Sequence, residues 1–217
     1  MSGLGLAVLS GAARTEGDAW HMELALHAAA AVNDAAAISK LLAAGARIEA
    51  RDKARRTALL IATRANAIEA AAVLIDARAD VNAKDNIRDT PFLYAGAEGR
   101  LEILRLCLGT GANLKDTNRY GGVALIPAAH HGHRETVREL LKTAIAVDHI
   151  NRLGWTALLE TIILSDGGPT HRDILGQLIA AGADVNMADG EGVRPLAHAK
   201  NRGYGEMIRM LEAAGAR

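Results

Sequence analysis

Short apolar runs alternate with polar turns along the chain, and the alternation has a nearly constant period. The recurring segments open at Thr57, Thr90, Val123, Thr156 and Arg194, with spacings of 33, 33, 33 and 38 residues. A second motif, which reads LIAAGADVN from Leu178, recurs in the same phase from Leu41, Leu74 and Cys107. Two markers that keep one phase over four periods indicate an internal repeat.

Each repeat reads as a polar turn followed by two short helices. Asp or Asn opens the turn, where a side-chain oxygen can accept hydrogen bonds from nearby backbone. These residues are Asp52, Asp85, Asn118, Asn151 and Asp189. Threonine then stands where a helix N-cap is needed, at Thr57, Thr90 and Thr156, and Pro91 suits a first helical position. Val123 leaves one unit without this cap.

The two predicted helices carry further regular positions. A small residue recurs on the first helix, at Ala29, Ala62, Ala95, Ala128 and Ala199, which lets adjacent units approach closely. Glycine follows the second helix at Gly45, Gly111, Gly182 and Gly215, as a left-handed C-terminal cap requires. Arg78 and Ala144 take this place in two units, where a left-handed backbone would cost about 1 kcal/mol. We expect these two units to be less stable, or to turn differently.

Helix pairs of this size bury their apolar faces only by stacking on neighbouring pairs. The period, the segment TPFLYAGAEG from Thr90 and the ending AGADVN from Ala181 closely resemble the ankyrin repeat. The resemblance extends from about Glu23 to the C-terminus, and the sequence is similar to single-domain bacterial ankyrin proteins. It implies an all-α solenoid of helix–turn–helix units joined by hairpin-like loops.

On this interpretation residues 23–217 form one ankyrin repeat domain of about six units, including two degenerate caps. The predicted units are 23–51, 52–84, 85–117, 118–150, 151–188 and 189–217. Residues 1–22 form a leader, in which GLGLAVLSGAA is either the remnant of an export signal or a frayed segment, since it lacks a positively charged n-region. We expect a cytoplasmic protein, or a periplasmic or exported one if Met1 truncates a signal peptide.

The 38-residue spacing locates an insertion at residues 165–171, which read SDGGPTH. This segment falls in the turn between the two helices of the fifth unit and accounts for the extra residues. Longer surface loops cost little free energy. The insertion is therefore either a tolerated loop or a surface that contacts a partner.

The composition and the absence of certain motifs argue against several classes of function. Aromatic residues are only 3% of the chain, which favours closely packed helices, and the 25 basic and 25 acidic residues do not indicate a nucleic-acid footprint. The single cysteine, Cys107, excludes an internal disulfide and is expected in the core. No apolar run approaches the roughly 20 residues of a membrane span. Catalytic motifs are absent, so we expect neither an enzyme nor a cofactor.

The resemblance implies recognition of another protein by hairpin tips and by the inner helices. We expect a non-catalytic interaction module that is a monomer. Because the tips are basic or aromatic, we expect its partner to have an acidic surface. The predicted partner-binding residues are Lys53, Arg55, Arg56, Asn86, Arg88, Arg119, Tyr120, Arg152 and Trp155. The alternative is that the tips are only solvated and that Trp155 packs over its own hairpin.

A histidine cluster supplies a hypothesis of another class. His130 and His131 close an inner helix, and stacking should bring His171 and Asp166 alongside them, which suggests zinc binding or metal buffering. Units about 10 Å apart are wide for ligands that must converge to within about 2 Å of a metal. We therefore assign no metal ligand and keep metal binding as the alternative. The resemblance implies a structural role for His133.

Overall fold

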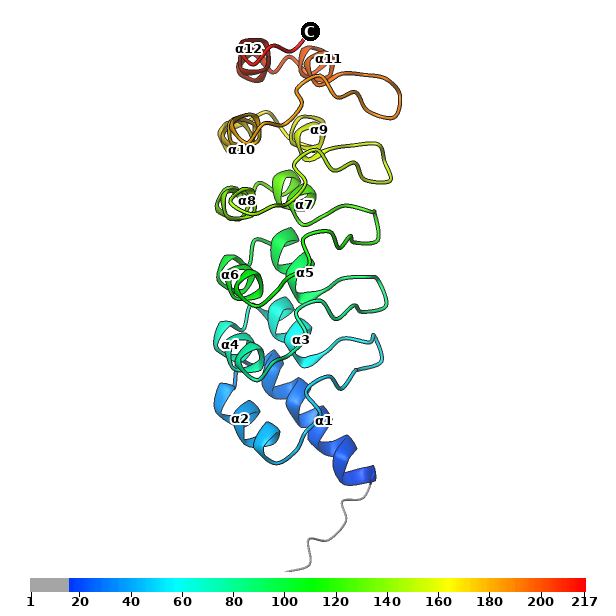
Figure 1. Cartoon of the computed structure of the whole chain (residues 1–217), viewed down its shortest axis with the longest axis vertical. Coiled ribbons are helices and arrows are strands. Elements are labelled where there is room, and N and C mark those ends of the chain that lie inside the picture. Colours follow the sequence, from blue (N-terminus) through cyan, green and yellow to red (C-terminus); the bar gives the residue numbers. More distant parts are fainter. Residues whose placement is uncertain (1–15) are drawn as a thin grey trace, which may run out of the picture.

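The computed structural model describes the backbone of residues 16–217 and side chains from residue 20 onward. This part of the chain contains twelve α-helices and no strand, arranged as six successive pairs in a single stack (Figure 1). One column consists of α1 (Glu16–Ala31), α3 (Ala58–Ala65), α5 (Pro91–Ala97), α7 (Leu125–His130), α9 (Ala157–Ile163) and α11 (Pro195–Asn201). The other consists of α2 (Ala35–Ala43), α4 (Ile68–Asp76), α6 (Leu101–Gly109), α8 (Arg134–Leu141), α10 (Pro169–Ala180) and α12 (Gly205–Ala213). We call them the inner and outer columns and number the units one to six.

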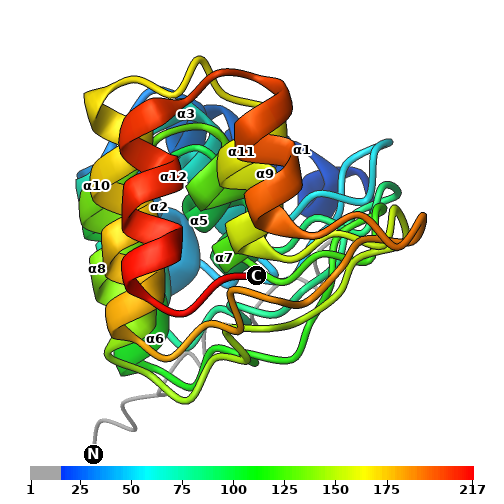
Figure 2. The ribbon, with the colours of Figure 1, turned by 90° about the horizontal axis from the view of Figure 1, so that it is seen from above.

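Stacking of neighbours builds the core. Closely contacting helices belong to the same unit or to adjacent units, and the buried side chains form one cluster along the stack. Viewed from above, the loops that join successive units project to one side of the helices (Figure 2). The predicted all-α solenoid is confirmed. No helix of the described residues is long and apolar enough to cross a membrane.

The inner helices begin where the threonine signals predict. The hydroxyls of Thr57, Thr90 and Thr156 accept hydrogen bonds from backbone N–H groups three residues on, at 3.3, 3.0 and 3.2 Å. Helix α7 starts without such a bond, as Val123 in place of threonine implies. The recurring alanines are buried, and Thr161 fills their position in unit five with its hydroxyl bonded to the carbonyl of Ala157.

The outer helices that lack the terminal glycine end in two different ways. Gly45 has φ +90°, and Arg78 adopts the same left-handed conformation with φ +70°. Ala144 is not left-handed; instead, Thr143 Oγ1 accepts a 3.2 Å hydrogen bond from the N–H of Ile145. The prediction that one of these units turns differently is therefore confirmed for unit four.

Two segments differ from the sequence-based expectation. Helix α1 begins at Glu16, ahead of the predicted leader boundary at residue 22, and the proposed export-signal stretch lies outside the described residues. The insertion is only partly a loop, because Pro169 starts α10 and residues 169–171 lengthen that helix. The ring of Tyr204 lies against Gly167, and its hydroxyl donates a 2.5 Å hydrogen bond to the carbonyl of Ser165. The insertion is thus packed against unit six.

Candidate functional site

The loops between units end in five similar hairpin tips, which we call fingers and number by unit. Fingers 2 to 6 are residues 52–56, 85–89, 118–122, 151–155 and 189–193. In each, Oδ1 of the first residue accepts hydrogen bonds from the backbone N–H groups two and four residues on, at 2.8–3.1 Å. The fourth residue is left-handed in every finger. The predicted Asp and Asn turns are therefore present in all five.

The second polar atom of this first side chain is free to contact another group. In finger 2, Asp52 Oδ2 accepts a 2.7 Å hydrogen bond from Nε of Arg56. In finger 6, Asp189 Oδ2 accepts a 2.7 Å hydrogen bond from Nε2 of His198 on α11. In finger 5, where the first residue is Asn151, its Nδ2 donates instead, to Oε1 of Glu160 on α9 at 2.8 Å. The first residue of the finger is therefore an asparagine where the facing residue, Glu160, is a carboxylic acid, and an aspartate where the facing residue is His198.

The predicted tip residues fall into two groups. Lys53, Arg55, Arg88, Arg119 and Tyr120 are exposed, and the Arg119 guanidinium lies 4.8 Å from the centre of the Tyr120 ring. The second group comprises Arg56 and Trp155, which are partly buried, and Asn86 and Arg152, which are exposed but hydrogen-bonded to a neighbouring finger.

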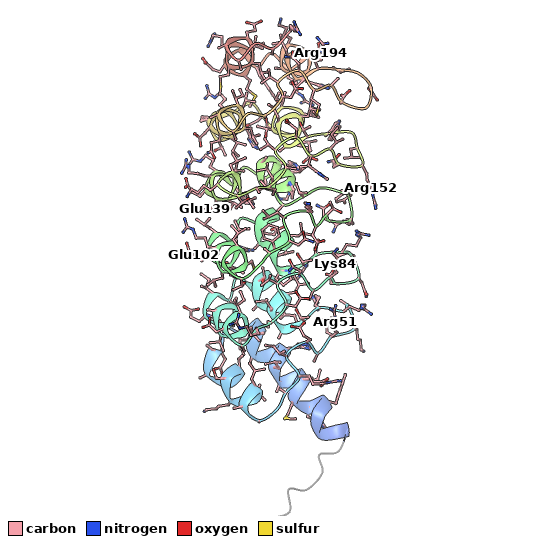
Figure 3. The ribbon with its side chains drawn as sticks, in the orientation of Figure 1. Arg51, Lys84, Glu102, Glu139, Arg152 and Arg194 are labelled. Carbon is pink, nitrogen blue, oxygen red and sulfur yellow. The ribbon has the colours of Figure 1, made fainter. Side chains whose placement is uncertain are left out.

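Members of the second group tie fingers together. The Asn86 N–H donates to the carbonyl of Ala54 at 3.0 Å, and the Arg152 N–H donates to that of Tyr120 at 2.9 Å. The guanidinium of Arg152, which lies on the finger side in Figure 3, donates to the carbonyl of Arg119 at 2.9 Å. Arg51 and Lys84, labelled on the same side, also link units through a hydrogen bond from Arg51 to the carbonyl of Lys84. These groups stabilise the finger array.

The sequence-based prediction selected tip residues by charge and aromaticity, and it therefore omitted Ile87 and Leu153. Ile87, Tyr120 and Leu153 occupy the same position of fingers 3, 4 and 5, and they are 43%, 53% and 54% exposed. Large exposed apolar side chains on three successive units form a patch of the kind that marks a binding surface. The sequence contains the information needed to find them, because aligning the repeats places the three residues in one column.

These fingers border a groove against the inner helices. The groove has a volume of about 560 Å³, and Tyr94 of α5, Pro127 of α7 and Leu164 after α9 contribute to its wall. Its acidic and basic lining residues, with histidine counted among the basic ones, are Arg64, Asp89, Glu98, Arg119, His130, His131 and Glu160. The size and the mixed lining are typical of a binding site.

The half of the groove nearer units two to four carries balanced charge. Arg64 lies 3.8 Å from Asp89 and 4.5 Å from the centre of the Tyr94 ring. Burial and the neighbouring Asp85 raise the pKa of Asp89, while Arg119 and Arg64 oppose the rise. We call this the lower half.

The half nearer unit five, the upper half, has a buried carboxyl. Glu160 is 6% exposed, and its Oε2 lies 3.7 Å from Nδ1 of His130. Burial raises the pKa of Glu160 to about 6, although the hydrogen bond from Asn151 acts against the rise. Burial also lowers the pKa of His130, and the nearby His131 and His171 lower it further.

The histidine cluster is used for contacts between units. Nδ1 of His131 lies 2.6 Å from the carbonyl oxygen of Ala97, and Nε2 of His171 lies 2.9 Å from that of His130. His133 packs on Gly99, where a Cβ would come within 2.6 Å of the ring. Asp166 is 3.8 Å from His171. The described residues contain no group of three His, Cys, Asp or Glu side chains placed to hold a metal ion.

Stacked helix pairs with projecting fingers and a groove between them define a repeat protein of the ankyrin type. A family model described as "Ankyrin repeats (3 copies)" matches residues 8–85, 26–118 and 92–189. These matches cover most of the chain, which belongs to the ankyrin repeat family. Ankyrin repeats are generally protein-interaction modules.

Solved structures extend the similarity to nearly the whole chain. An ankyrin repeat domain from Acinetobacter baumannii AYE is 56% identical, with a TM-score of 0.86 over 88% of this chain and 98% of that one. The ankyrin repeat protein EF0377 is 38% identical, with a TM-score of 0.84 over 88% and 97%. The ankyrin repeat domain of Bcl-3, at 24% identity and a TM-score of 0.80 over 89% and 86%, shares the fold.

A curated bacterial relative matches a shorter segment. The ankyrin repeat protein YahD of Escherichia coli (strain K12) is 42% identical over 59 residues, which are 27% of this chain and 29% of YahD. The match therefore spans less than a third of that relative. Bacterial homologues are present, in agreement with the similarity inferred from the sequence.

Proposed function

We propose that the protein is a non-catalytic, monomeric module that binds a partner protein in the groove and along the fingers. The observation that carries this proposal is the column of Ile87, Tyr120 and Leu153, three exposed apolar side chains that line one groove from successive fingers. Burial of such side chains against a partner supplies most of the binding free energy in protein interfaces.

The exposed basic tips favour a partner with acidic groups beside its apolar ones. Lys53, Arg55, Arg88 and Arg119 are exposed, whereas Arg56 is neutralised by an ion pair with Asp52 at 2.7 Å. Charges at the rim of an interface act mainly on the association rate and on the choice of partner. We therefore assign recognition of an acidic surface to the first four, with the apolar column as the anchor.

Affinity capture from the native lysate tests this proposal. Wild-type protein is compared with Leu153→Asp, which places a charge in the apolar column, and with the double variant Arg88→Glu/Arg119→Glu. We expect both variants to lose the captured partner while they melt like the wild type. The matched control is Arg134→Glu, an exposed position at the start of α8 in the outer column.

The proposal is wrong if Leu153→Asp and the double variant both capture the same partner as the wild type. Sedimentation velocity of the purified protein tests the proposed monomer, since a stable dimer in the working concentration range would contradict it.

A further inference from the structure

One buried carboxyl in the groove, that of Glu160, has a single hydrogen bond among the described residues. Glu160 occupies the position at which other units carry Ile61, Tyr94, Pro127 and His198, so an acid here is particular to unit five. Its side chain is only 8% exposed, yet it lines the groove. Glutamate is almost never this buried unless it is paired.

The hydrogen bonds of Glu160 leave one oxygen available. Oε1 accepts from Asn151, a neutral donor. Among the described residues, the one interaction of Oε2 is with His130, at 3.7 Å, which is longer than a hydrogen bond. His130 is a weak source of positive charge near neutral pH, because burial and the neighbouring histidines lower its pKa.

Among the residues that the structure describes, no lysine or arginine forms an ion pair with this carboxyl. His130 at the end of α7 and His131, which follows it, act on this carboxyl, and His171 of α10 lies against His130. The equivalent position of α11, the next inner helix, carries His198, whose ring is bonded to Asp189. The guanidinium groups of the groove, Arg64 and Arg119, act on Asp89 in the lower half and not on Glu160.

We propose that the upper half of the groove is a subsite for a cationic side chain of the partner, which forms an ion pair with Oε2 of Glu160. The inference rests on the proposed function, since it names one element of the protein that the groove binds. A lysine ammonium or an arginine guanidinium has the required charge, and its aliphatic stem suits the apolar side chains of Tyr120, Leu153 and Leu164 that line the approach. The partner then combines one inserted basic side chain with acidic groups at the basic finger tips.

A purely structural role for Glu160 can be separated from recognition. If Glu160 served only to hold finger 5 through Asn151, an uncharged acceptor would do the same. Glu160→Gln provides that acceptor, because its amide oxygen can still receive the Asn151 hydrogen bond while the charge is lost. Glu102→Gln, on the exposed surface of α6, is the matched control for removal of a carboxylate (Figure 3).

A randomised peptide library displayed on phage, selected on the full-length chain at pH 7.5, tests the proposal. We expect the selected peptides to share a lysine or arginine at one fixed position, with acidic residues elsewhere. By calorimetry, a selected peptide should bind Glu160→Gln at least about tenfold more weakly than wild type, and Glu102→Gln with unchanged affinity. Acidification to pH 5 should weaken binding more for wild type than for Glu160→Gln, because protonation removes the charge of Glu160.

Two results overturn the subsite and are distinguishable from failure of the proposed function. Peptides without a shared basic position, or with equal affinity for wild type and Glu160→Gln, show that a groove ligand exists but does not use Glu160. If every selected peptide still binds Leu153→Asp normally, the groove itself is not the binding surface, and the subsite is rejected with it.

Discussion

The side-chain oxygen of Asn33 accepts a 2.9 Å hydrogen bond from the backbone N–H of Ala70, so the turn of unit one caps an outer helix of unit two. Ala70 is the third residue of α4, whose own N-cap residue, Ala67, provides no side-chain bond. Asn33 also donates a hydrogen bond to Glu69. Adjacent units are therefore joined by a polar contact as well as by apolar packing.

This contact predicts a measurable loss of stability. Asn33 has φ +60°, so Asn33→Gly keeps the backbone unstrained and removes the cap together with the hydrogen bond to Glu69. We expect the free energy of unfolding, measured in urea, to fall by about 1 kcal/mol. Asn66→Gly is the control, since Asn66 occupies the equivalent turn of unit two with φ +54°. An equal loss in both variants would show that the inter-unit cap contributes nothing.

The left-handed arginine in unit two gives a second prediction. Arg78→Gly should raise the free energy of unfolding by up to about 1 kcal/mol, because glycine adopts the observed φ of +70° without a steric cost. Ala144→Gly should give no gain, since Ala144 is not left-handed and glycine adds conformational entropy to the unfolded chain. Thermal melts of the two variants, compared with wild type, provide the measurement. A gain in Ala144→Gly that matches Arg78→Gly would contradict the difference between the two turns.

Glu160 predicts a pH-dependent difference between two proteins. Its pKa is raised from 4.5 to about 6 in the folded state, so between these values the folded chain binds more protons than the unfolded chain. The contribution of Glu160 to stability therefore falls as pH rises through this window, and above it the charged group costs about 2 kcal/mol. We expect Glu160→Gln to exceed wild type in stability by about this amount at pH 7.5 and by little below pH 4.5.

Urea unfolding of both proteins across this pH range is the measurement. The lowered pKa of His130 acts in the opposite direction, but it is present in both proteins and largely cancels in the comparison. A difference that is constant with pH would show that the gain comes from packing and not from the titration of Glu160.

Cys107 predicts slow thiol chemistry. It is fully buried, and burial raises the pKa of its thiol to about 12, so the reactive thiolate is scarce at neutral pH. An aromatic disulfide reagent should label it at least about a hundredfold more slowly in the native protein than in urea, since labelling requires opening of unit three. Labelling at the unfolded rate in native buffer would place Cys107 outside the core.

The sequence predicts those features of the fold that depend on neighbours along the chain. Thr57, Thr90 and Thr156 cap helices because each acts on backbone three residues away, and the finger turns close within five residues. The bond between Asn33 and Ala70 joins residues far apart in sequence, so no local pattern indicates it. Pro169 indicates a helix start within the insertion, but the two glycines before it favoured the prediction of a loop.

The groove was harder to predict than the fold. Exposure of the tip residues was expected, but the hydrogen bonds that engage Arg56 and Arg152 depend on the geometry of the hairpins. A search for charged and aromatic residues does not select Ile87 and Leu153, but the repeat alignment places both of them in one column with Tyr120. The burial of Glu160 depends on how α7, α9 and finger 5 meet, and this is a tertiary property.

In fingers 5 and 6 the first residue uses its two polar side-chain atoms for two different contacts, one within the hairpin and one with the inner helix. Oδ1 closes the hairpin in all five fingers, while in fingers 5 and 6 the other atom matches the residue that the inner helix presents, in the pairs Asn151–Glu160 and Asp189–His198. Replacing Asn151 with Asp and Glu160 with His would give unit five the Asp–His pair that unit six has in Asp189 and His198. The lining of the groove at this position can therefore be changed by exchanging one residue pair, while the hairpin keeps its hydrogen bonds.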